Sequence, residues 1–246
     1  MDRMLYVAMT GARETMLAQA INANNLANVS TTAFRGDLAA ARSMPVYGEG
    51  QPSRVYAMTE RPGIDLRPGV INQTGRELDV AVRGEGWIAV QARDGSEAYT
   101  RAGDLRVSTA GLLVTGAGHP VLGNAGPIAL PPAKKVEIAV DGTISVLGLD
   151  QNPNAVAVLD RIKLVNPPLD QLEKGTDGLL RSTTEAVVAP DASARLATGA
   201  LEGSNVSAVE AMVEMVALSR RFEAQVKMMT TAEQTDEAAA RLLKLA

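Results

Sequence analysis

The two ends of the chain carry apolar residues at a helical period, whereas its middle alternates apolar and polar residues. Residues 204–246 contain no Gly or Pro, although the rest of the chain holds all 22 Gly and all 12 Pro. Apolar positions in this stretch recur alternately three and four residues apart, which predicts one long helix with a coiled-coil seam that a single serine interrupts. The seam consists of Met212, Met215, Ser219, Phe222, Val226 and Met229.

A second apolar stripe lies beside this seam in the same predicted helix. Its members are Val206, Val209, Val213 and Val216. Because one partner helix covers one stripe, two stripes predict two or more neighbours. The alternative is a core helix inside an ordinary domain. Ser207 and Glu210 have the spacing of a capping box, which predicts that the helix begins there.

The first 28 residues or so predict a second helix, because their apolar positions also recur four and three residues apart. This seam consists of Leu5, Met9, Ala12, Met16, Gln19, Ala23 and Leu26. Gly11 lowers the stability of the helix by about 1 kcal/mol relative to Ala, so the helix needs a partner. We expect that partner to be the C-terminal helix. The N-terminal helix should end within residues 22–28, where four Asn compete for backbone hydrogen bonds.

Between the helices the pattern changes twice. Residues 36–75 contain four prolines, which predicts an extended linker with one short helix near residues 38–42. From Leu78 onwards short apolar runs alternate with polar residues, and the pairs Asp94-Gly95 and Asp141-Gly142 predict tight hairpin turns between strands. This pattern predicts an all-β domain that is sandwich-like or barrel-like.

The predicted fold class is therefore α+β. The N- and C-terminal helices pair as a coiled-coil-like module, and an all-β domain is inserted between them. The predicted segments are residues 1–35 for the N-terminal helix and the turn that follows it, 36–75 for the linker, 76–195 for the β domain, and 196–246 for a return segment and the long helix.

Composition excludes several classes of protein. The net charge is −4 and aromatic residues make up only 3% of the chain, so the basic surface and the stacking platforms of a nucleic-acid-binding protein are missing. There is no Cys for disulfides or thiolate metal sites. No apolar run reaches the length of a membrane-spanning helix, and we expect no membrane insertion. The first residues also lack the pattern of a cleaved signal peptide.

Candidate catalytic groups are few. Gly84-Glu85-Gly86 resembles the start of a dinucleotide-binding loop, but it lies between two predicted strands, whereas such a loop opens a helix. A tight turn at a sheet corner explains these glycines. His119 is the only histidine, so it has no partner for a zinc site, and we expect it in a surface turn. The acidic residues Glu85, Asp94, Glu97 and Asp104 lie near Arg83, Arg93, Arg101 and Arg106, and we expect solvated, locally paired charges. The sequence predicts no catalytic residue, cofactor, metal or small-molecule substrate.

Three separated blocks of the chain resemble the bacterial flagellar axial proteins, a family of rod, hook and hook-associated proteins. The first block is residues 23–35, ANNLANVSTTAFR. The second is residues 74–87, TGRELDVAVRGEGW, continued by residues 99–103 and 111–115. The third begins at residues 201–206, LEGSNV, and continues through residues 214–216 and 221–223 to Lys227. Together the blocks cover nearly the whole chain.

Within this family, residues 1–12 and the segment from Arg220 to Met229 are most similar to proximal-rod members. The alternative is a distal-rod member or another axial paralogue; distal-rod members typically have Tyr at the position of Phe222. The resemblance implies a non-enzymatic structural subunit of the flagellar basal-body rod, the shaft that transmits torque for motility. It also implies terminal helices packed as an inner tube with β domains outside.

The resemblance further implies export through the flagellar type III apparatus without a cleaved signal peptide, and a place in the rod that spans the periplasm. The expected partners are other copies of the chain, other rod proteins and the export apparatus. Two other classes remain open: a monomeric extracellular binding module, and an enzyme that uses Glu85, Asp104 or His119. We expect subunit interactions at Leu5, Met9, Met16, Asn24, Asn25, Leu26, Asn28, Phe34, Ser204, Asn205, Val206, Val209, Met212, Val213, Met215, Val216, Phe222, Val226 and Met229.

Overall fold

The computed structural model describes residues 4–45, 55–60, 63–148, 157–184 and 188–245, and it divides the chain into two compact units. The helical unit comprises residues 1–29, 36–65 and 206–246, and the β unit comprises residues 30–35 and 66–205. The chain therefore crosses between the units four times. Two terminal helices and an inserted β-rich region confirm the predicted α+β class.

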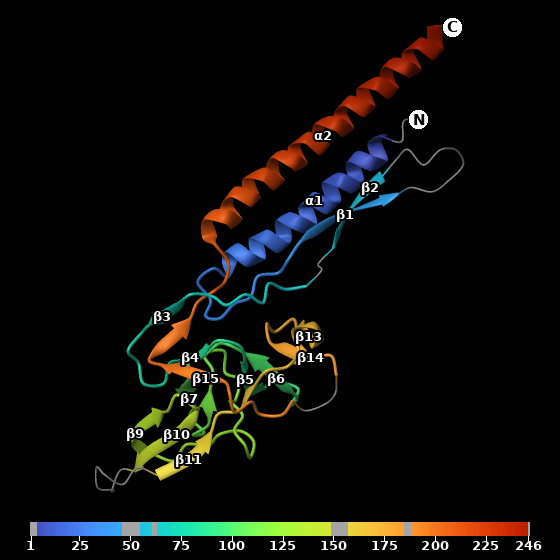
Figure 1. Cartoon of the computed structure of the whole chain (residues 1–246). Coiled ribbons are helices and arrows are strands. Elements are labelled where there is room, and N and C mark those ends of the chain that lie inside the picture. Colours follow the sequence, from blue (N-terminus) through green and yellow to red (C-terminus); the bar gives the residue numbers. More distant parts are fainter. Residues whose placement is uncertain (1–3, 46–54, 61–62, 149–156, 185–187, 246) are drawn as a thin grey trace. The chain divides into compact units, whose positions relative to one another are not determined.

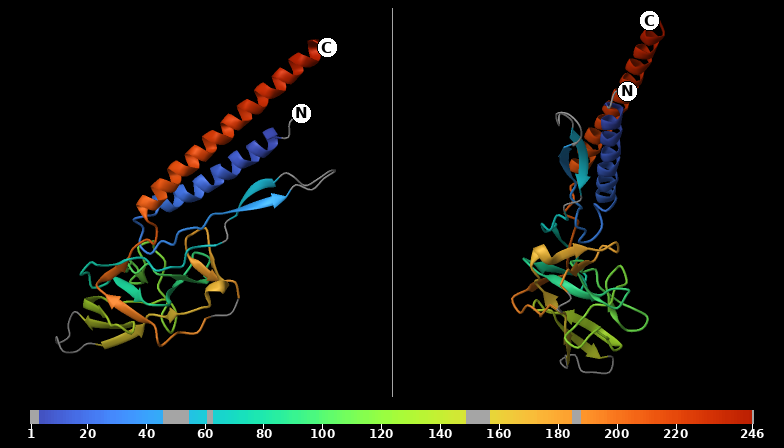
Figure 2. Two further views of the ribbon diagram at one scale, coloured as in Figure 1. Left: turned by 45° about the horizontal axis from the view of Figure 1, so that its top comes forward. Right: turned by 90° about the vertical axis from the view of Figure 1, so that its right-hand side faces the viewer.

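Two antiparallel helices dominate the helical unit. Helix α1 spans Met4–Ala27 and helix α2 spans Ala208–Leu245, and they lie side by side in every view (Figures 1 and 2). At about 1.5 Å per residue, α2 is roughly 57 Å long and α1 roughly 36 Å. The Ser207 hydroxyl accepts a hydrogen bond from the Glu210 N–H at 3.4 Å, so the predicted N-cap of α2 is confirmed.

Small side chains make the contact between the helices. The buried residues are Ala8, Gly11 and Ala12 in α1 and Ala211, Leu218 and Ala232 in α2. Two hydrogen bonds fix the register: Gln19 Nε2 donates to Ser219 Oγ at 3.5 Å, and Asn22 Nδ2 donates to the Ala211 carbonyl at 2.7 Å.

The predicted N-terminal seam is only partly correct, since Ala12 is buried and Gln19 bonds to α2 as predicted. Its large members Leu5, Met9 and Met16 are exposed, whereas the residue before each of the last two, Ala8 and Thr15, is buried or half-buried. The reason is the lack of space on this side of α1: a Cβ on Gly11 would lie 2.9 Å from the Gln225 side chain of α2. Residues as large as Met do not fit into so narrow a contact.

On α2 the predicted seam is correct at four of its six positions, one of which is Ser219, the partner of Gln19. Met215, Phe222 and Met229 are half-buried, and between them the contact uses Ala211, Leu218, Gln225 and Ala232. Met212 and Val226, which the prediction placed in the seam, are exposed. The three-and-four spacing identifies the period of the helix. The predicted seam and the observed contact residues both have that period, so only packing against α1 selects between them.

The linker prediction for residues 36–75 is corrected by a β-hairpin. Strand β1, Ala40–Pro45, pairs antiparallel with β2, Val55–Glu60, and no helix occurs at residues 38–42. Glu14 of α1 holds the hairpin, because its carboxylate accepts the Thr59 N–H at 2.7 Å and its carbonyl accepts the Thr59 hydroxyl at 3.1 Å. A backbone N–H on a strand edge that has no β partner thereby finds its hydrogen-bond acceptor in a helix side chain.

The β unit consists of small antiparallel sheets around one apolar core. The largest has the strand order β12-β5-β6-β14-β13, another has the order β11-β10-β9, and β15–β4, β16–β3 and β7–β8 form pairs. The strands are β3 Ile71–Gln73, β4 Val80–Arg83, β5 Trp87–Gln91, β6 Glu97–Thr100, β7 Arg106–Val107, β8 Leu113–Val114, β9 Ala133–Ile138, β10 Thr143–Gly148, β11 Ala157–Arg161, β12 Leu164–Val165, β13 Leu172–Lys174, β14 Leu180–Ser182, β15 Arg195–Thr198 and β16 Ala200–Glu202. A 3₁₀ turn, Leu169–Gln171, precedes β13.

The turn signals of the sequence are confirmed in this unit. Asp141 and Gly142 connect β9 to β10, and Asp94 and Gly95 connect β5 to β6. Aliphatic side chains such as Ile88, Leu105 and Ile144 fill the core completely. Neither helix of the described residues combines the length and the apolar character that a membrane crossing requires.

We predict that Gly103→Ala lowers the free energy of unfolding of the β unit by about 2–3 kcal/mol. A Cβ at this position would overlap the backbone carbonyl of Val80, which cannot rotate away as a side chain would. Urea unfolding followed by the fluorescence of Trp87, the only tryptophan, measures the loss.

Gly95→Ala is the matched control for this measurement. Gly95 has a φ of 85° and open space around its Cα, so an added Cβ costs only the strain of that backbone conformation, about 1 kcal/mol. Equal stability of the Gly103→Ala and wild-type proteins would contradict the close contact with Val80.

Candidate assembly site

Helix α1 has a free apolar face. At about 100° of rotation per residue, Ala8, Gly11 and Ala12 share the side that contacts α2, and Glu14 lies on the side that holds the hairpin. The remaining side carries the exposed side chains of Leu5, Tyr6, Met9, Met16 and Leu17. We call these five residues the α1 free face.

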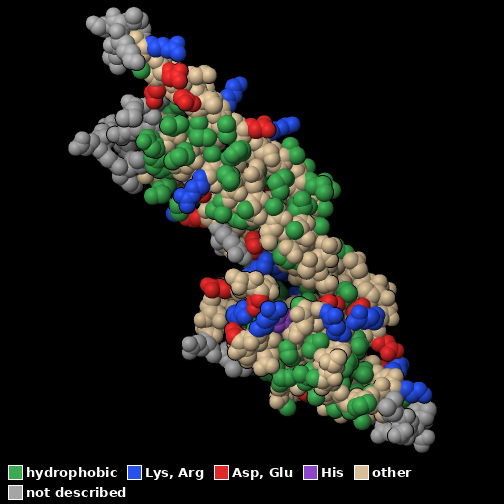
Figure 3. Space-filling model, turned by 180° about the vertical axis from the view of Figure 1, so that it is seen from behind, with side chains coloured by type: hydrophobic (Ala, Val, Ile, Leu, Met, Phe, Trp, Pro, Cys, Tyr) green, Lys and Arg blue, Asp and Glu red, His purple; other side chains and the backbone are tan. Residues whose placement is uncertain are grey.

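Helix α2 has a corresponding face on the side opposite its contact with α1. Its members are Val209, Met212, Val213 and Val216, and Val209 has 72% of its surface exposed. We call these four residues the α2 free face. Figure 3 shows hydrophobic side chains gathered over the helical unit, and charged side chains towards the C-terminal end of α2. Isolated exposed apolar residues are ordinary, but contiguous stripes of this kind mark interaction surfaces.

The residues expected to contact other subunits thus occupy three environments. Exposed members are Leu5, Met9, Met16, Asn24, Val209, Met212, Val213, Val216 and Val226. Half-buried members of the helical unit are Asn25, Leu26, Asn28, Val206, Met215, Phe222 and Met229. Phe34, Ser204 and Asn205 are half-buried members of the β unit.

Several of the polar members form bonds within the chain. The Asn25 side chain pairs with the backbone of Asp37 through two hydrogen bonds of 2.8 Å, one donated and one accepted. The Asn28 side chain donates to the Asn24 carbonyl at the end of α1. Asn residues in this segment therefore end the helix and fix the start of the next segment, as their local hydrogen-bonding capacity favours.

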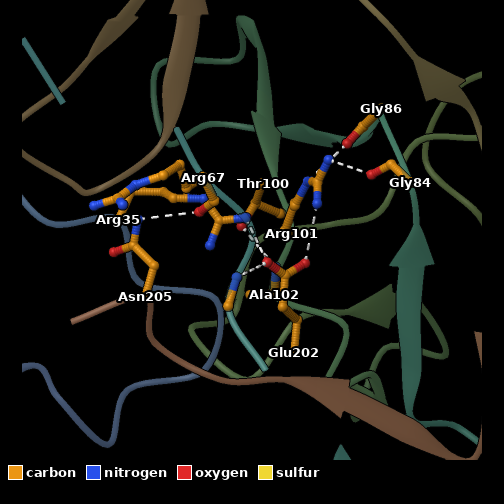
Figure 4. Close-up of polar contacts among 10 residues, drawn as sticks. Arg35, Arg67, Gly84, Gly86, Thr100, Arg101, Ala102, Glu202 and Asn205 are labelled. Carbon is orange, nitrogen blue, oxygen red and sulfur yellow. Dashed lines mark hydrogen bonds and ion pairs between the residues drawn. The ribbon is translucent and has the colours of Figure 1, made fainter. Parts of the chain in front are cut away.

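A buried ionic cluster in the β unit joins remote parts of the sequence. Arg35 Nη2 donates to Glu202 Oε1 at 2.5 Å, and Arg101 Nη1 donates to Glu202 Oε2 at 3.3 Å (Figure 4). Both guanidinium groups lie over the ring of Trp87, at 5.6 Å for Arg35 and 5.0 Å for Arg101. All three charged residues have less than a tenth of their surface exposed.

Arg101 also fixes the turn between β4 and β5. Its Nε donates to the Gly86 carbonyl at 2.9 Å and its Nη2 to the Gly84 carbonyl at 2.7 Å (Figure 4). Burial lowers the pKa of the Arg101 guanidinium, and the Glu202 carboxylate opposes that shift. Because strands flank Gly84 and Gly86, their interpretation as a sheet-corner turn is confirmed. The expectation that Arg101 is solvated is wrong.

The sequence alone does not predict this cluster as a site. Arg35 and Glu202 stand inside the blocks that resemble axial proteins, but alternation alone places a charged residue on a solvent face. The only available signal was the presence of opposite charges in two of the separated blocks.

The residues considered for catalysis make structural contacts within the β unit. His119 has only 7% of its surface exposed, so the expected surface position is wrong; its N–H donates to Thr115 Oγ1 in a turn that packs onto the β unit. Hydrogen bonds from Ser96 lower the pKa of the exposed Asp94 carboxyl. A cavity of about 360 Å³ is lined by Glu97 and Lys163, which bind each other at 2.8 Å. Within the described segments, no group of three acidic or histidine side chains is arranged to hold a metal ion.

Paired terminal helices with free apolar faces, and a β unit inserted between them, match the flagellar rod and hook class of proteins. The family model described as the C-terminal region of the flagellar basal body rod FlgEFG proteins matches residues 197–242. The model described as the D1 domain of the flagellar hook protein FlgE/F/G matches residues 81–146.

Similar whole proteins narrow this class. The flagellar basal-body rod proteins FlgF of Salmonella typhimurium and Escherichia coli are 45% and 44% identical to the chain, each over the full length of both proteins. The rod protein FlgG of Bacillus subtilis is 28% identical, over 95% of this chain and 96% of that protein. The chain belongs to the FlgF family of flagellar basal-body rod proteins. The predicted family and the predicted role as a basal-body rod protein are confirmed.

We predict that Glu14→Ala accelerates hydrogen exchange at the Thr59 amide about tenfold. The substitution removes the carboxylate that accepts this N–H, and a tenfold change corresponds to about 1.4 kcal/mol, near the lower end of the usual range for a hydrogen bond to a charged group. Hydrogen exchange of the purified chain measures the effect.

Glu60→Ala serves as the control in the same hairpin. It removes only the Arg42–Glu60 ion pair, in which both side chains are exposed, and such pairs contribute little. Wild-type exchange at Thr59 in the Glu14→Ala protein would show that α1 does not hold the hairpin.

Proposed function

We propose that this protein is a structural, non-enzymatic subunit of the proximal part of the flagellar rod. It assembles through the α1 and α2 free faces with other copies of itself and with other rod proteins. The observation that carries this proposal is the placement of the large apolar side chains. On the α1 side the intramolecular contact uses Ala and Gly, so the large apolar side chains of the two free faces remain available for neighbouring subunits.

The proximal position is supported by the comparison with relatives. Identity is 45% to an FlgF protein and 28% to an FlgG protein, which favours the former over a paralogue elsewhere in the axial structure. The family resemblance adds the expected surroundings: a rod that spans the periplasm, and passage through the flagellar export apparatus without a cleaved signal peptide. A torque-transmitting shaft then follows from many such helix contacts acting together.

The architecture in finer detail is also part of this proposal. Half-buried or buried positions on α2 recur three and four residues apart between Ala211 and Ala232, which supports a coiled-coil-like pair with α1. One continuous apolar core behind several antiparallel sheets supports a sandwich-like or barrel-like β domain. The subunit contacts would then add helix neighbours to this pair.

Burial of the free faces supplies the energy of assembly. A fully buried Met or Val side chain contributes about 1.5–3 kcal/mol relative to an exposed one. The two faces together hold nine exposed large side chains, so even partial burial outweighs the entropy that two subunits lose on binding. An α1 face that meets an α2 face of another copy is a heterologous contact, which builds an open helical assembly when the rotation between copies does not close a ring.

We predict that Val209→Glu combined with Val213→Glu abolishes incorporation into the rod and motility. Both side chains are exposed in the single chain, so helix content by circular dichroism should remain at the wild-type level. Burying two carboxylates at an interface costs several kcal/mol, equivalent to at least a hundredfold loss of affinity. Rod preparations from a strain carrying only the variant measure incorporation.

Gln234→Glu is the matched control, because it adds a charge at an exposed polar position of the same helix. It should incorporate normally and support motility. A motile strain with the double variant in its rods would contradict the proposed interface. A chain that never enters rods, together with strong hydrogen-exchange protection of α1 and α2 in the isolated monomer, would favour the binding module instead.

A further inference from the structure

Glu202, at the end of strand β16, accepts hydrogen bonds with both its side chain and its backbone carbonyl. Its Oε1 accepts from Arg35 Nη2 at 2.5 Å and from the Gly69 N–H at 2.8 Å, and its Oε2 accepts from Arg101 at 3.3 Å. Its backbone carbonyl accepts the Ala33 N–H at 2.8 Å. The residue is 1% exposed, so one buried carboxylate connects the segments around residues 35, 69 and 101.

These contacts surround two of the points at which the chain leaves the β unit, after Arg35 and after Asn205. We call residues 33–35 and 202–205 the exit segments. The Asn205 N–H donates to the Phe34 carbonyl at 3.2 Å, so the exit segments are bonded to each other by backbone as well as by side chains. Lys174 adds a third support, since its ammonium donates to the Arg35 carbonyl at 2.7 Å and lies 4.2 Å from the Phe34 ring.

The cluster is poorly suited to stabilising the β unit. Two guanidinium groups face one carboxylate, and Arg35 Nε and Nη1 are buried without a hydrogen-bond partner in the described part of the chain. Such N–H groups cost free energy, and buried ion pairs are often no more stable than well-packed apolar side chains. The cluster instead supplies directional hydrogen bonds, and these fix the positions of the backbone segments around residues 35, 69 and 101.

We propose that Glu202, through Arg35, is a positioning residue for rod assembly. It fixes the exit segments side by side, so that the chain leading to residues 36–65 after Arg35 and to α2 after Asn205 starts from one defined arrangement. This inference rests on the proposed function. It adds that assembly depends on the geometry of the exit segments as well as on the free faces, and that a β unit of normal stability with loosened exit segments will not assemble.

The test uses Arg35→Met in the full-length chain. This substitution removes the unpartnered N–H groups and keeps an apolar stem over Trp87, while Glu202 retains Arg101 and the Gly69 N–H. We expect the unfolding midpoint of the β unit, followed by Trp87 fluorescence, to stay within a few degrees of wild type. Hydrogen exchange at the Ala33 and Asn205 amides should accelerate tenfold or more, and incorporation into rods should be lost.

Two further variants complete the design. Arg35→Lys keeps a donor for Glu202 and should restore both the slow exchange and incorporation, which a requirement for bulk alone would not predict. Glu202→Gln keeps an acceptor for the Gly69 N–H but removes the charge. It should accelerate exchange at the Ala33 and Asn205 amides as Arg35→Met does, and it keeps the test valid if the Arg35→Met protein folds poorly. Lys163→Met is the control: it breaks another ion pair, with Glu97, which is less deeply buried and lies away from the exit segments. It should lower stability and leave Ala33 and Asn205 protected.

The outcomes are separable. Wild-type exchange at Ala33 and Asn205 in both Arg35→Met and Glu202→Gln overturns the proposal. Faster exchange spread over the whole β unit in proportion to lost stability also overturns it, because the cluster would then only stabilise the fold. Loosened exit segments with normal incorporation overturn the positioning role alone. Failure of the proposed function appears differently, as a wild-type chain that does not enter rods.

Discussion

The contact between α1 and α2 depends on side-chain size, and the arrangement of the helical unit follows from it. Ala8, Gly11 and Ala12 leave room for α2, and the Gln225 side chain occupies the space that a Cβ on Gly11 would need. On α1 the larger apolar residues are therefore turned away from the pair. A pair that also buried Leu5, Met9 and Met16 in its interface would have left less apolar surface for other molecules. The unequal lengths of the helices add to this, because beyond Ala232 nearly all of the described α2 side chains are exposed.

The β unit has a different role, because it fixes the segments at which the chain leaves it. Its core is made of aliphatic side chains and accounts for its stability. The charged residues at its exit segments are arranged around a single carboxylate and a single indole ring. Stability and positioning are thus assigned to different residues of the same unit, which allows each to be changed without the other.

The sequence predicted the parts of this protein that depend on local patterns. Helix ends at Ser207 and in the Asn-rich segment, the turns at Asp94-Gly95 and Asp141-Gly142, and the α+β class all follow from neighbouring residues. The α1–α2 contact face did not, because two heptad series share the same period and differ only in side-chain volume, which matters only when the partner is present. The hairpin at residues 40–60 was missed since its outer support is a helix residue, Glu14, 45 positions from its partner Thr59. The Glu202 cluster was missed because burial of a charge depends on partners distant in sequence.

The bond between the exit segments also bears on how quickly the helices find each other. Gln19 and Ser219 are 200 residues apart, so joining them directly would close a very long loop. Once the β unit has folded and Phe34 is bonded to Asn205, the flexible chain left between the helices shortens to roughly 30 residues, which lowers the entropic cost of closure by about 1.7 kcal/mol. Part of the search for the correct helix pairing is thereby completed before the helices meet. The effective sequence separation of the contacts between α1 and α2 then becomes that of a small local motif rather than that of the whole chain.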